Sequence, residues 1–362
     1  MEFESSFPSE SISFERTLDE IPSESLEQFL NSTRSHTAPL GTTHIAALDA
    51  HLASTASLHV SSLSSINRGD VLEIQGPPSS GKSHLVYHLI CNCILPSVFS
   101  GWNKAAIVYD LDRTFDITRL RQLLRSRISA HTTHVSDLPT AISNALRNLR
   151  IFAISSSTQL AASLAHLPIY HAEHLPTSEI ALIAIDSMSA FYWPDRFSLE
   201  NITHAPPPHA HPQTPSDHHP LHQVLKALQN VRRSHGSLVA MTNWGLLPRT
   251  NGPVYSTSYK QHLHPFPVLA PPTALPIESI YLPLTHQITL NRAVILPFPS
   301  STALEDAWHE AQHAAQNAIH EKIIGRVRSS RTDRVGTFSF KIGPDDMIVQ
   351  DAQSHDTENM EA

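Results

Sequence analysis

Hydrophobic and polar positions alternate along the middle of the chain in a pattern that predicts strands followed by helices. Short apolar runs, typical of buried strands, occur at residues 71–75, 105–112, 149–155, 180–186 and 238–243. Stretches with hydrophobic residues at helical spacing follow four of these runs, at 84–95, 116–128, 158–167 and 221–234. Strands that alternate with helices predict a mainly parallel sheet covered on both faces, and therefore an α/β core.

Two later segments are predicted to extend one edge of this sheet. Residues 287–296 and 337–342 have the pattern of strands, and we expect both as antiparallel additions. A helix is predicted between them, over 303–324. Small apolar residues at helical spacing over 42–63 predict one more helix before the core.

The two ends of the chain and two internal stretches depart from this alternation. Residues 1–36 are acidic and serine-rich, which predicts a disordered leader. We expect a folded core over 37–345 and a disordered tail over 346–362. Insertions rich in proline and histidine, at about 204–220 and 248–276, are predicted to be long surface loops. Each follows a predicted strand, at the sheet end where open α/β proteins place their ligands.

Composition narrows the class of protein. The 362 residues are 40% hydrophobic and only 16% charged, with a net charge of −8. Such a chain has enough apolar residues for a core, but its charge argues against coating nucleic acid by bulk electrostatics. We expect no membrane span, since no apolar run approaches the roughly 20 residues that one needs. The two cysteines, Cys91 and Cys93, are too few for a disulfide framework and are predicted to be buried thiols in a reducing compartment.

A phosphate-binding motif occupies the turn after the first predicted strand. The pattern G-x-x-x-x-G-K-[ST] is matched at every fixed position by the run Gly76, Pro77, Pro78, Ser79, Ser80, Gly81, Lys82 and Ser83. Glycines at both ends let the backbone curl so that successive N–H groups point at an anion, and the following helix adds its positive dipole end. We expect Lys82 to reach the β- and γ-phosphates of ATP and Ser83 to bind Mg²⁺.

Carboxylates at the ends of two other predicted strands complete this candidate site. Asp186 ends an apolar strand and is expected as the second magnesium ligand. Asp110 and Asp112 end the strand at 105–112. Either could orient or deprotonate a water molecule, and either could instead cap the following turn.

These residues together resemble the RecA-type recombinase family, and within it the eukaryotic recombinase paralogues. The resemblance covers about residues 40–300 and rests on residues 69–74, the phosphate loop, Asp110 to Asp112, Ser155 to Thr158, and Ile185 to Trp193. It implies a RecA-like P-loop NTPase core that binds ATP and Mg²⁺. It also implies a role in homologous-recombination repair of DNA double-strand breaks in the nucleus, as a subunit assembled with other recombinase paralogues.

Departures from the family pattern imply weak or no ATP hydrolysis. Asp112 stands where the family has a longer, water-activating glutamate, so its reach is one methylene shorter. Thr242 and Asn243 match the sensor strand, but Trp244 replaces the glutamine that couples nucleotide to DNA. The regions after Trp193 and after Trp244, which contact DNA in the family, are poor in lysine and arginine. Contact with DNA is therefore expected to be weak or made through the complex.

Two other functions stay open on the sequence. One is a competent P-loop ATPase or kinase that acts on an unknown substrate through Asp110 or Asp112. The other is a nucleotide-independent interaction module, because Pro77 and Pro78 lack N–H groups that could meet a phosphate. A basic cluster before the last predicted strand could contact DNA phosphates or an acidic partner, or could be a solvated face: Lys322, Arg326, Arg328, Arg331 and Arg334.

Overall fold

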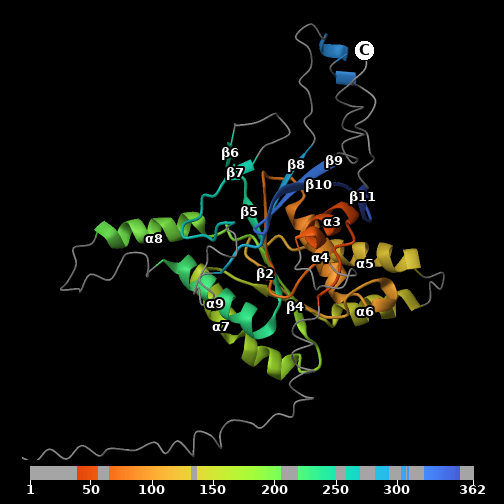
Figure 1. Ribbon diagram of the computed structural model, residues 1–362, viewed down its shortest axis with the longest axis horizontal. Coiled ribbons are helices and arrows are strands. Elements are labelled where there is room, and N and C mark those ends of the chain that lie inside the picture. Colours follow the sequence, from red (N-terminus) through yellow and green to blue (C-terminus); the bar gives the residue numbers. More distant parts are fainter. Residues whose placement is uncertain are drawn as a thin grey trace, which may run out of the picture. The chain divides into compact units, whose positions relative to one another are not determined.

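A nine-stranded sheet organises the described part of the chain (Figure 1). The structure is a computed structural model that describes residues 39–55, 65–131, 137–204, 219–249, 258–269, 282–292, 303–306, 308–309 and 322–350. All of these residues belong to one compact unit, which begins at Pro39. The predicted leader and the histidine-rich stretch at 205–218 lie outside the described residues.

The central strands of the sheet are parallel and the strands at one edge are antiparallel. The strands are β1 Val71–Gly76, β2 Ala105–Asp110, β3 Leu149–Ala153, β4 Ile180–Asp186, β5 Leu238–Trp244, β8 His286–Arg292, β9 Lys322–Ser329, β10 Thr332–Ile342 and β11 Met347–Gln350. Their order is β11-β10-β9-β8-β1-β5-β4-β2-β3. The ladders from β3 to β8 are parallel, and those from β8 to β11 are antiparallel.

Helices cover both faces of this sheet (Figure 1). They are α3 Ala46–Ser54, α4 Lys82–Ile94, α5 Ile117–His131, α6 Leu138–Leu146, α7 Ser157–His174, α8 Tyr192–His204 and α9 Pro220–His235. Helices α3 to α6 pack into one hydrophobic core, and α7 and α9 pack into the other. The predicted fold class, a mainly parallel sheet with helices on both faces and antiparallel edge strands, is confirmed.

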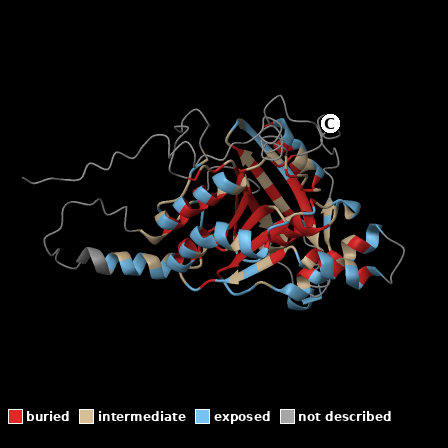
Figure 2. Cartoon of the chain, turned by 90° about the horizontal axis from the view of Figure 1, so that it is seen from below, coloured by how far each residue is buried: buried red, intermediate tan, exposed pale blue. Residues whose placement is uncertain are grey.

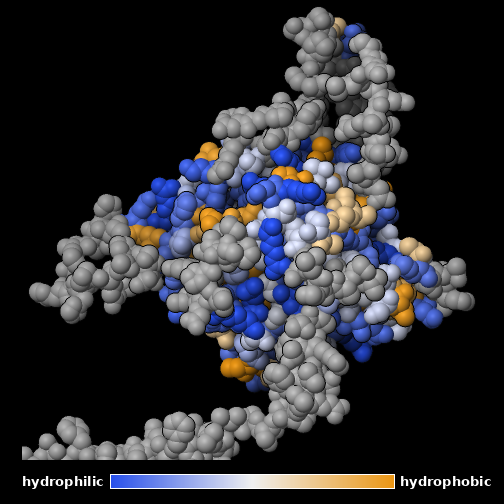
Figure 3. Space-filling model, in the orientation of Figure 1, coloured by the Kyte–Doolittle hydropathy of each residue, from blue (hydrophilic) through white to orange (hydrophobic). Residues whose placement is uncertain are grey.

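Burial follows the predicted pattern most closely in the central strands (Figure 2). Every residue of β1 and β2 is buried, Glu73 and Gln75 included, as expected for central strands of a sheet covered on both faces. On the face shown in Figure 3, hydrophobic side chains are scattered among hydrophilic ones. Among the described helices, none is long and apolar enough to cross a membrane.

Three predictions at the antiparallel edge are wrong in detail. Strand β8 is parallel to β1, although we predicted an antiparallel addition there. The helix predicted over 303–324 cannot extend to its expected end, because β9 already begins at Lys322. The predicted tail begins too early, because Met347–Gln350 forms β11 and pairs with β10. In each case strand pairing, which a local pattern does not contain, decides the outcome.

The two stretches predicted as loops have different outcomes. Most of the first, 204–220, lies outside the described residues; at its ends, His204 is the last residue of α8 and Pro220 the first of α9. The stretch at 248–276 contributes to a short antiparallel pair, formed by β6 Leu247–Arg249 and β7 Ser258–Lys260. Hydrogen bonds between β6 and β7 pair backbone N–H and C=O groups that an irregular loop would expose to water.

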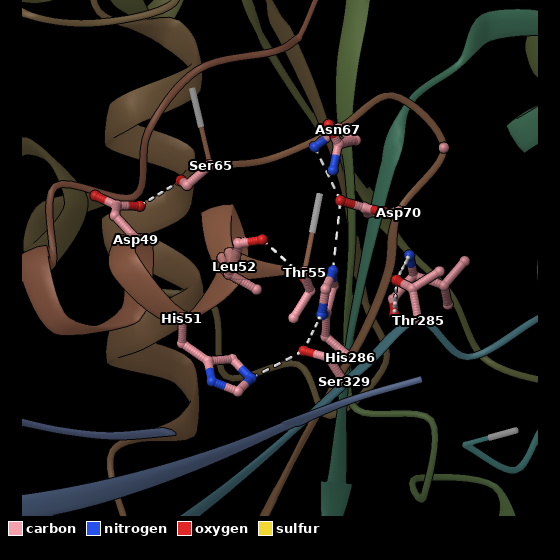
Figure 4. Close-up of polar contacts among 12 residues, drawn as sticks. Asp49, His51, Leu52, Thr55, Ser65, Asn67, Asp70, Thr285, His286 and Ser329 are labelled. Carbon is pink, nitrogen blue, oxygen red and sulfur yellow. Dashed lines mark hydrogen bonds and ion pairs between the residues drawn. The ribbon is translucent and has the colours of Figure 1, made fainter. Parts of the chain in front are cut away.

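A buried polar cluster joins α3 to the antiparallel strands (Figure 4). Ser329 Oγ of β9 is hydrogen-bonded to His51 Nε2 of α3 at 3.0 Å and to His286 Nδ1 of β8 at 2.8 Å. The other nitrogen of His286, Nε2, lies 3.5 Å from Asp70 Oδ2. All four side chains are buried. They satisfy each other's polar atoms inside the core and thereby hold α3 against β9.

Candidate nucleotide site

Two glycines shape the phosphate loop between β1 and α4. A Cβ on Gly76 would lie 2.5 Å from both the Leu290 carbonyl oxygen and Ser80 Oγ. Gly81 has a φ of +89°, and a Cβ there would lie 2.7 Å from Cδ1 of Ile323. The tight turn therefore leaves room for glycine alone at both fixed positions of the motif.

The Lys82 side chain folds back over the start of this loop. Its Nζ donates hydrogen bonds to the carbonyl oxygens of Gly76, at 2.9 Å, and Pro77, at 2.8 Å. Burial lowers the pKa of Lys82, and the nearby carboxylates of Asp186 and Asp112 act in the opposite direction. The ammonium group thus binds two carbonyl oxygens of the loop and lies near two acidic side chains.

The loop residues fit a bound phosphate group. Ser80 Oγ is buried and has no hydrogen-bond partner within the described residues. Pro78 and Ser79 are exposed, so the ring of Pro78 does not fill the inside of the loop. Lys82 and Ser83 begin α4, whose free N–H groups and dipole favour an anion at this end.

A magnesium ion would need the nucleotide as well as the protein in this site. Within the described ranges, no three His, Cys, Asp or Glu side chains gather closely enough to hold a metal. Ser83 and Asp186 would supply two oxygen ligands, and phosphate oxygens and water would supply the rest, as Mg²⁺ commonly requires. The donor set fits a nucleotide-bound ion rather than a protein cage.

Strands β4 and β5 position Asp186. It is the last residue of β4, and its Oδ1 accepts a hydrogen bond from Thr242 Oγ1 of β5. Parallel neighbours end at the same edge of the sheet, which is why residues 56 positions apart meet here. Thr242, predicted as part of a sensor strand, is therefore in the candidate site.

The two aspartates left open by the sequence have different roles. Asp110 is buried, and its carboxylate accepts the backbone N–H groups of Thr114 at 3.1 Å and Phe115 at 3.2 Å. It caps the turn after β2. Asp112 instead accepts a hydrogen bond from Ser187 Oγ at 2.7 Å. Partial burial of this carboxyl raises its pKa, and so does the proximity of Asp186 and Asp110.

Asn243 faces a buried network that the sequence analysis missed. Its amide donates to Glu73 Oε1 of β1 at 2.8 Å, and the same oxygen accepts from Gln261 at 2.7 Å. Gln287 of β8 donates to Glu73 Oε2 at 2.8 Å. Burial raises the pKa of Glu73, whereas these amide donors lower it. The glutamate three residues before the phosphate loop was the only signal in the sequence, and it resembles an ordinary strand residue.

Aromatic side chains after β4 and β5 lie together beside this network. The ring of His262 stacks on Trp244 at 6.3 Å between centroids and meets the edge of Tyr192 at 5.1 Å. Trp193 points outward and is 60% exposed, with the Arg196 guanidinium 5.9 Å from its ring centroid. Trp244, which stands at the position of the coupling glutamine, therefore makes a ring contact with His262.

The predicted thiols are buried, as expected. Cys91 and Cys93 are both fully buried in α4. Burial raises the pKa of Cys91 to about 12 and that of Cys93 further. Neither is a nucleophile at neutral pH.

Comparison with known proteins supports the resemblance. The chain is 35% identical over 130 residues to the DNA repair protein XRCC2 of Mus musculus, X-ray-repair cross-complementing protein 2. The chain resembles XRCC2. It is also 26% identical over 164 residues to the XRCC2 homolog of Arabidopsis thaliana. The aligned segments cover 36% and 37% of this chain and 44% of each relative.

The likeness to XRCC2 confirms the predicted resemblance to a eukaryotic recombinase paralogue. It extends over less than half of each relative, so activity, substrates and partners do not transfer with it. No protein-family model matches the chain.

Proposed function

We propose that the protein is an ATP-binding recombinase paralogue that works as a subunit of a complex in homologous-recombination repair of DNA double-strand breaks in the nucleus. We further propose that it hydrolyses ATP weakly or not at all. The observation that carries this proposal is the phosphate loop, over which the Lys82 ammonium group folds near the carboxylates of Asp186, at the end of β4, and Asp112. The similarity to DNA repair proteins supports the cellular role.

Nucleotide binding would use groups that the fold already positions. Lys82 would exchange the carbonyl oxygens of Gly76 and Pro77 for phosphate oxygens, which carry more negative charge. The buried hydroxyl of Ser80 would gain a partner. Thr242 would keep Asp186 oriented toward the metal shell.

Weak hydrolysis follows from the surroundings of Asp112. Its carboxylate is held by Ser187, and its side chain is shorter than the glutamate of the resembling family. General-base catalysis requires hydrogen-bond reach to the attacking water, so a short and already engaged carboxylate is a poor base. The bound nucleotide would then serve to support assembly of the complex rather than to be hydrolysed.

A binding experiment tests the nucleotide site. We expect a fluorescent ATP analogue with Mg²⁺ to bind the full chain, Lys82→Ala to abolish binding, and Lys226→Ala to leave it unchanged. Lys226 is an exposed lysine on α9 and controls for the loss of one positive charge. Failure of the unmodified protein to bind would favour the nucleotide-independent interaction module.

A second candidate function is a competent ATPase or kinase. The raised pKa of Asp112, beside Lys82, is what favours it, because a base is most effective when its pKa approaches the working pH. Single-turnover assays with γ-labelled ATP separate the two functions. Transfer on the order of 1 per second that is lost in Asp112→Asn would establish the enzyme and overturn the weak-hydrolysis proposal.

The repair complex is tested by purification from the protein's own cells. We expect other recombinase paralogues to co-purify with the full chain. Isolation of the chain alone, under conditions in which it still binds ATP, would contradict the role as a subunit without affecting the nucleotide site.

A further inference from the structure

Strand β9 has one face in the core and one face toward solvent. Its burial alternates strictly, with Ile323, Gly325, Val327 and Ser329 buried and the residues between them accessible. The accessible side chains are Lys322, Ile324, Arg326 and Arg328. Three of these four are cationic, so this face of β9 carries a row of positive charge, although Arg328 already donates a hydrogen bond to Gln287 Oε1 of β8. Strand β10 lies beside β9 (Figure 1).

A like-charge pair stands at one end of this row. Lys322 of β9 is directly opposite Lys341 of β10 in the antiparallel register. Like charges in such a pair destabilise a sheet. Among the described residues, no carboxylate forms an ion pair with either lysine. The repulsion is therefore not offset within the described part of the chain, and an external anion would relieve it.

The positive charge continues along the strand pair to the hairpin at its other end. Arg331 and Arg334, at the turn between β9 and β10, are both exposed. Residues 286–292 and 322–350 contain seven lysines or arginines and three aspartates, although the whole chain has a net charge of −8. Charge is therefore segregated onto the antiparallel edge.

We propose that this basic face, formed by Lys322, Arg326, Arg331, Arg334 and Lys341, binds the sugar-phosphate backbone of a nucleic acid. Alternate residues on a strand are about 6.6 to 6.8 Å apart, so the partner must repeat its negative charge at a similar interval. Arginine predominates, and its fork of N–H donors matches phosphate oxygens. The exposed Thr337, opposite Arg326, adds a hydroxyl of the kind that contacts phosphate.

The basic face is expected to bind nucleic acid without preference for a base sequence. Its aromatic neighbours Phe338 and Phe340 are buried on the opposite side of β10, so the described residues of this face offer bases no ring on which to stack. Binding is therefore electrostatic, independent of base sequence and steeply dependent on salt. The basic face is also distinct from the regions after Trp193 and Trp244.

Fluorescence anisotropy with a labelled 30-nucleotide oligo-dT tests this surface on the full chain without ATP. We expect Lys322→Gln/Lys341→Gln to weaken binding on the order of tenfold at low salt. The slope of log K against log salt should fall by about 1.4 for a single strand and about 1.8 for a duplex. Arg121→Gln/Arg125→Gln removes two exposed cations from α5 and should change neither value.

Several results would overturn the proposal. These are absence of binding by the unmodified protein at low salt, an unchanged affinity and slope in the double-lysine variant, or an equal loss in the α5 control. A poly-glutamate peptide that binds through Lys322 and Lys341, while oligo-dT does not, would assign the face to an acidic protein instead. Because the assay contains no ATP, Lys82→Ala should bind as the unmodified protein does, which separates this proposal from the nucleotide site.

Discussion

Burial is the main cause of the pKa shift of His88. His88 of α4 is buried, and its Nε2 lies 2.6 Å from the Thr43 carbonyl oxygen. Burial lowers the pKa of His88 to about 3, from 6.5 for an exposed imidazole. The folded protein therefore needs this ring neutral, whereas the unfolded chain binds a proton as the pH falls below 6.5.

We predict that His88 makes the protein less stable in mild acid. Since its pKa is depressed on folding, its contribution is complete above pH 6.5 and is lost as the pH falls toward 3. Between pH 7.5 and 5.0 the loss is about 2 kcal/mol. His88→Gln keeps a donor for the Thr43 carbonyl but cannot titrate. In urea unfolding, the free energy of unfolding should therefore fall between the two pH values by about 2 kcal/mol less in this variant than in the unmodified protein. Equal losses in both proteins would contradict this.

Elements far apart in the sequence are joined here by polar contacts as well as by apolar packing. Helix α3 precedes all nine strands of the sheet in the sequence. Its His51 is nevertheless hydrogen-bonded to Ser329, 278 positions along the chain. Gly336 of β10 lies so close to α3 that a Cβ would be 2.7 Å from the ring of His51. One hydroxyl and a close backbone approach thus add to the apolar packing that holds the helix against the antiparallel strands.

We predict that Ser329→Ala loosens α3. The substitution leaves His51 Nε2 and His286 Nδ1 buried without a partner, which should cost about 2 to 4 kcal/mol. Ser330→Ala is the matched control, because Ser330 makes no side-chain hydrogen bond within the described residues. Amide hydrogen exchange in residues 46–54 should accelerate in the first variant only. Unchanged exchange in Ser329→Ala would show that apolar packing alone holds the helix.

At the scale of the whole molecule, binding and stability are linked. The phosphate loop lies against Leu290 of β8 and Ile323 of β9. Strands from distant parts of the sequence therefore support the candidate site. A ligand that binds only the folded state stabilises all of these elements together.

We predict that ATP and Mg²⁺ raise the melting temperature of the full chain. At a nucleotide concentration 100 times the Kd, the gain is about 2.7 kcal/mol, which corresponds to roughly 5 °C or more. Scanning calorimetry with Lys82→Ala should show no shift, and Lys226→Ala should show the full shift. A shift retained in Lys82→Ala would place the bound nucleotide elsewhere.

Periodicity predicted the centre of the fold better than its edge. Strand β4 begins and ends at the predicted residues, because a fully buried parallel strand is a continuous apolar run in the sequence. Strand β9 has alternate buried and accessible residues and includes a glycine; its first three residues fell within the predicted helix 303–324, and the rest was not predicted as a strand. Its identity depends on a hairpin with β10 and on a ladder with β8, whose residues lie earlier in the chain.

The local chemistry of the phosphate loop was determined by the sequence itself. Gly76, Gly81 and Lys82 have a fixed spacing that only one tight turn accommodates, so short-range sterics place them correctly. Tertiary structure alone decided that Asp110 caps a turn while Asp112 faces Lys82, and that Asn243 binds Glu73 rather than the loop. The physical reason is that hydrogen-bond partners on neighbouring strands are set by register, and register is a property of the assembled sheet.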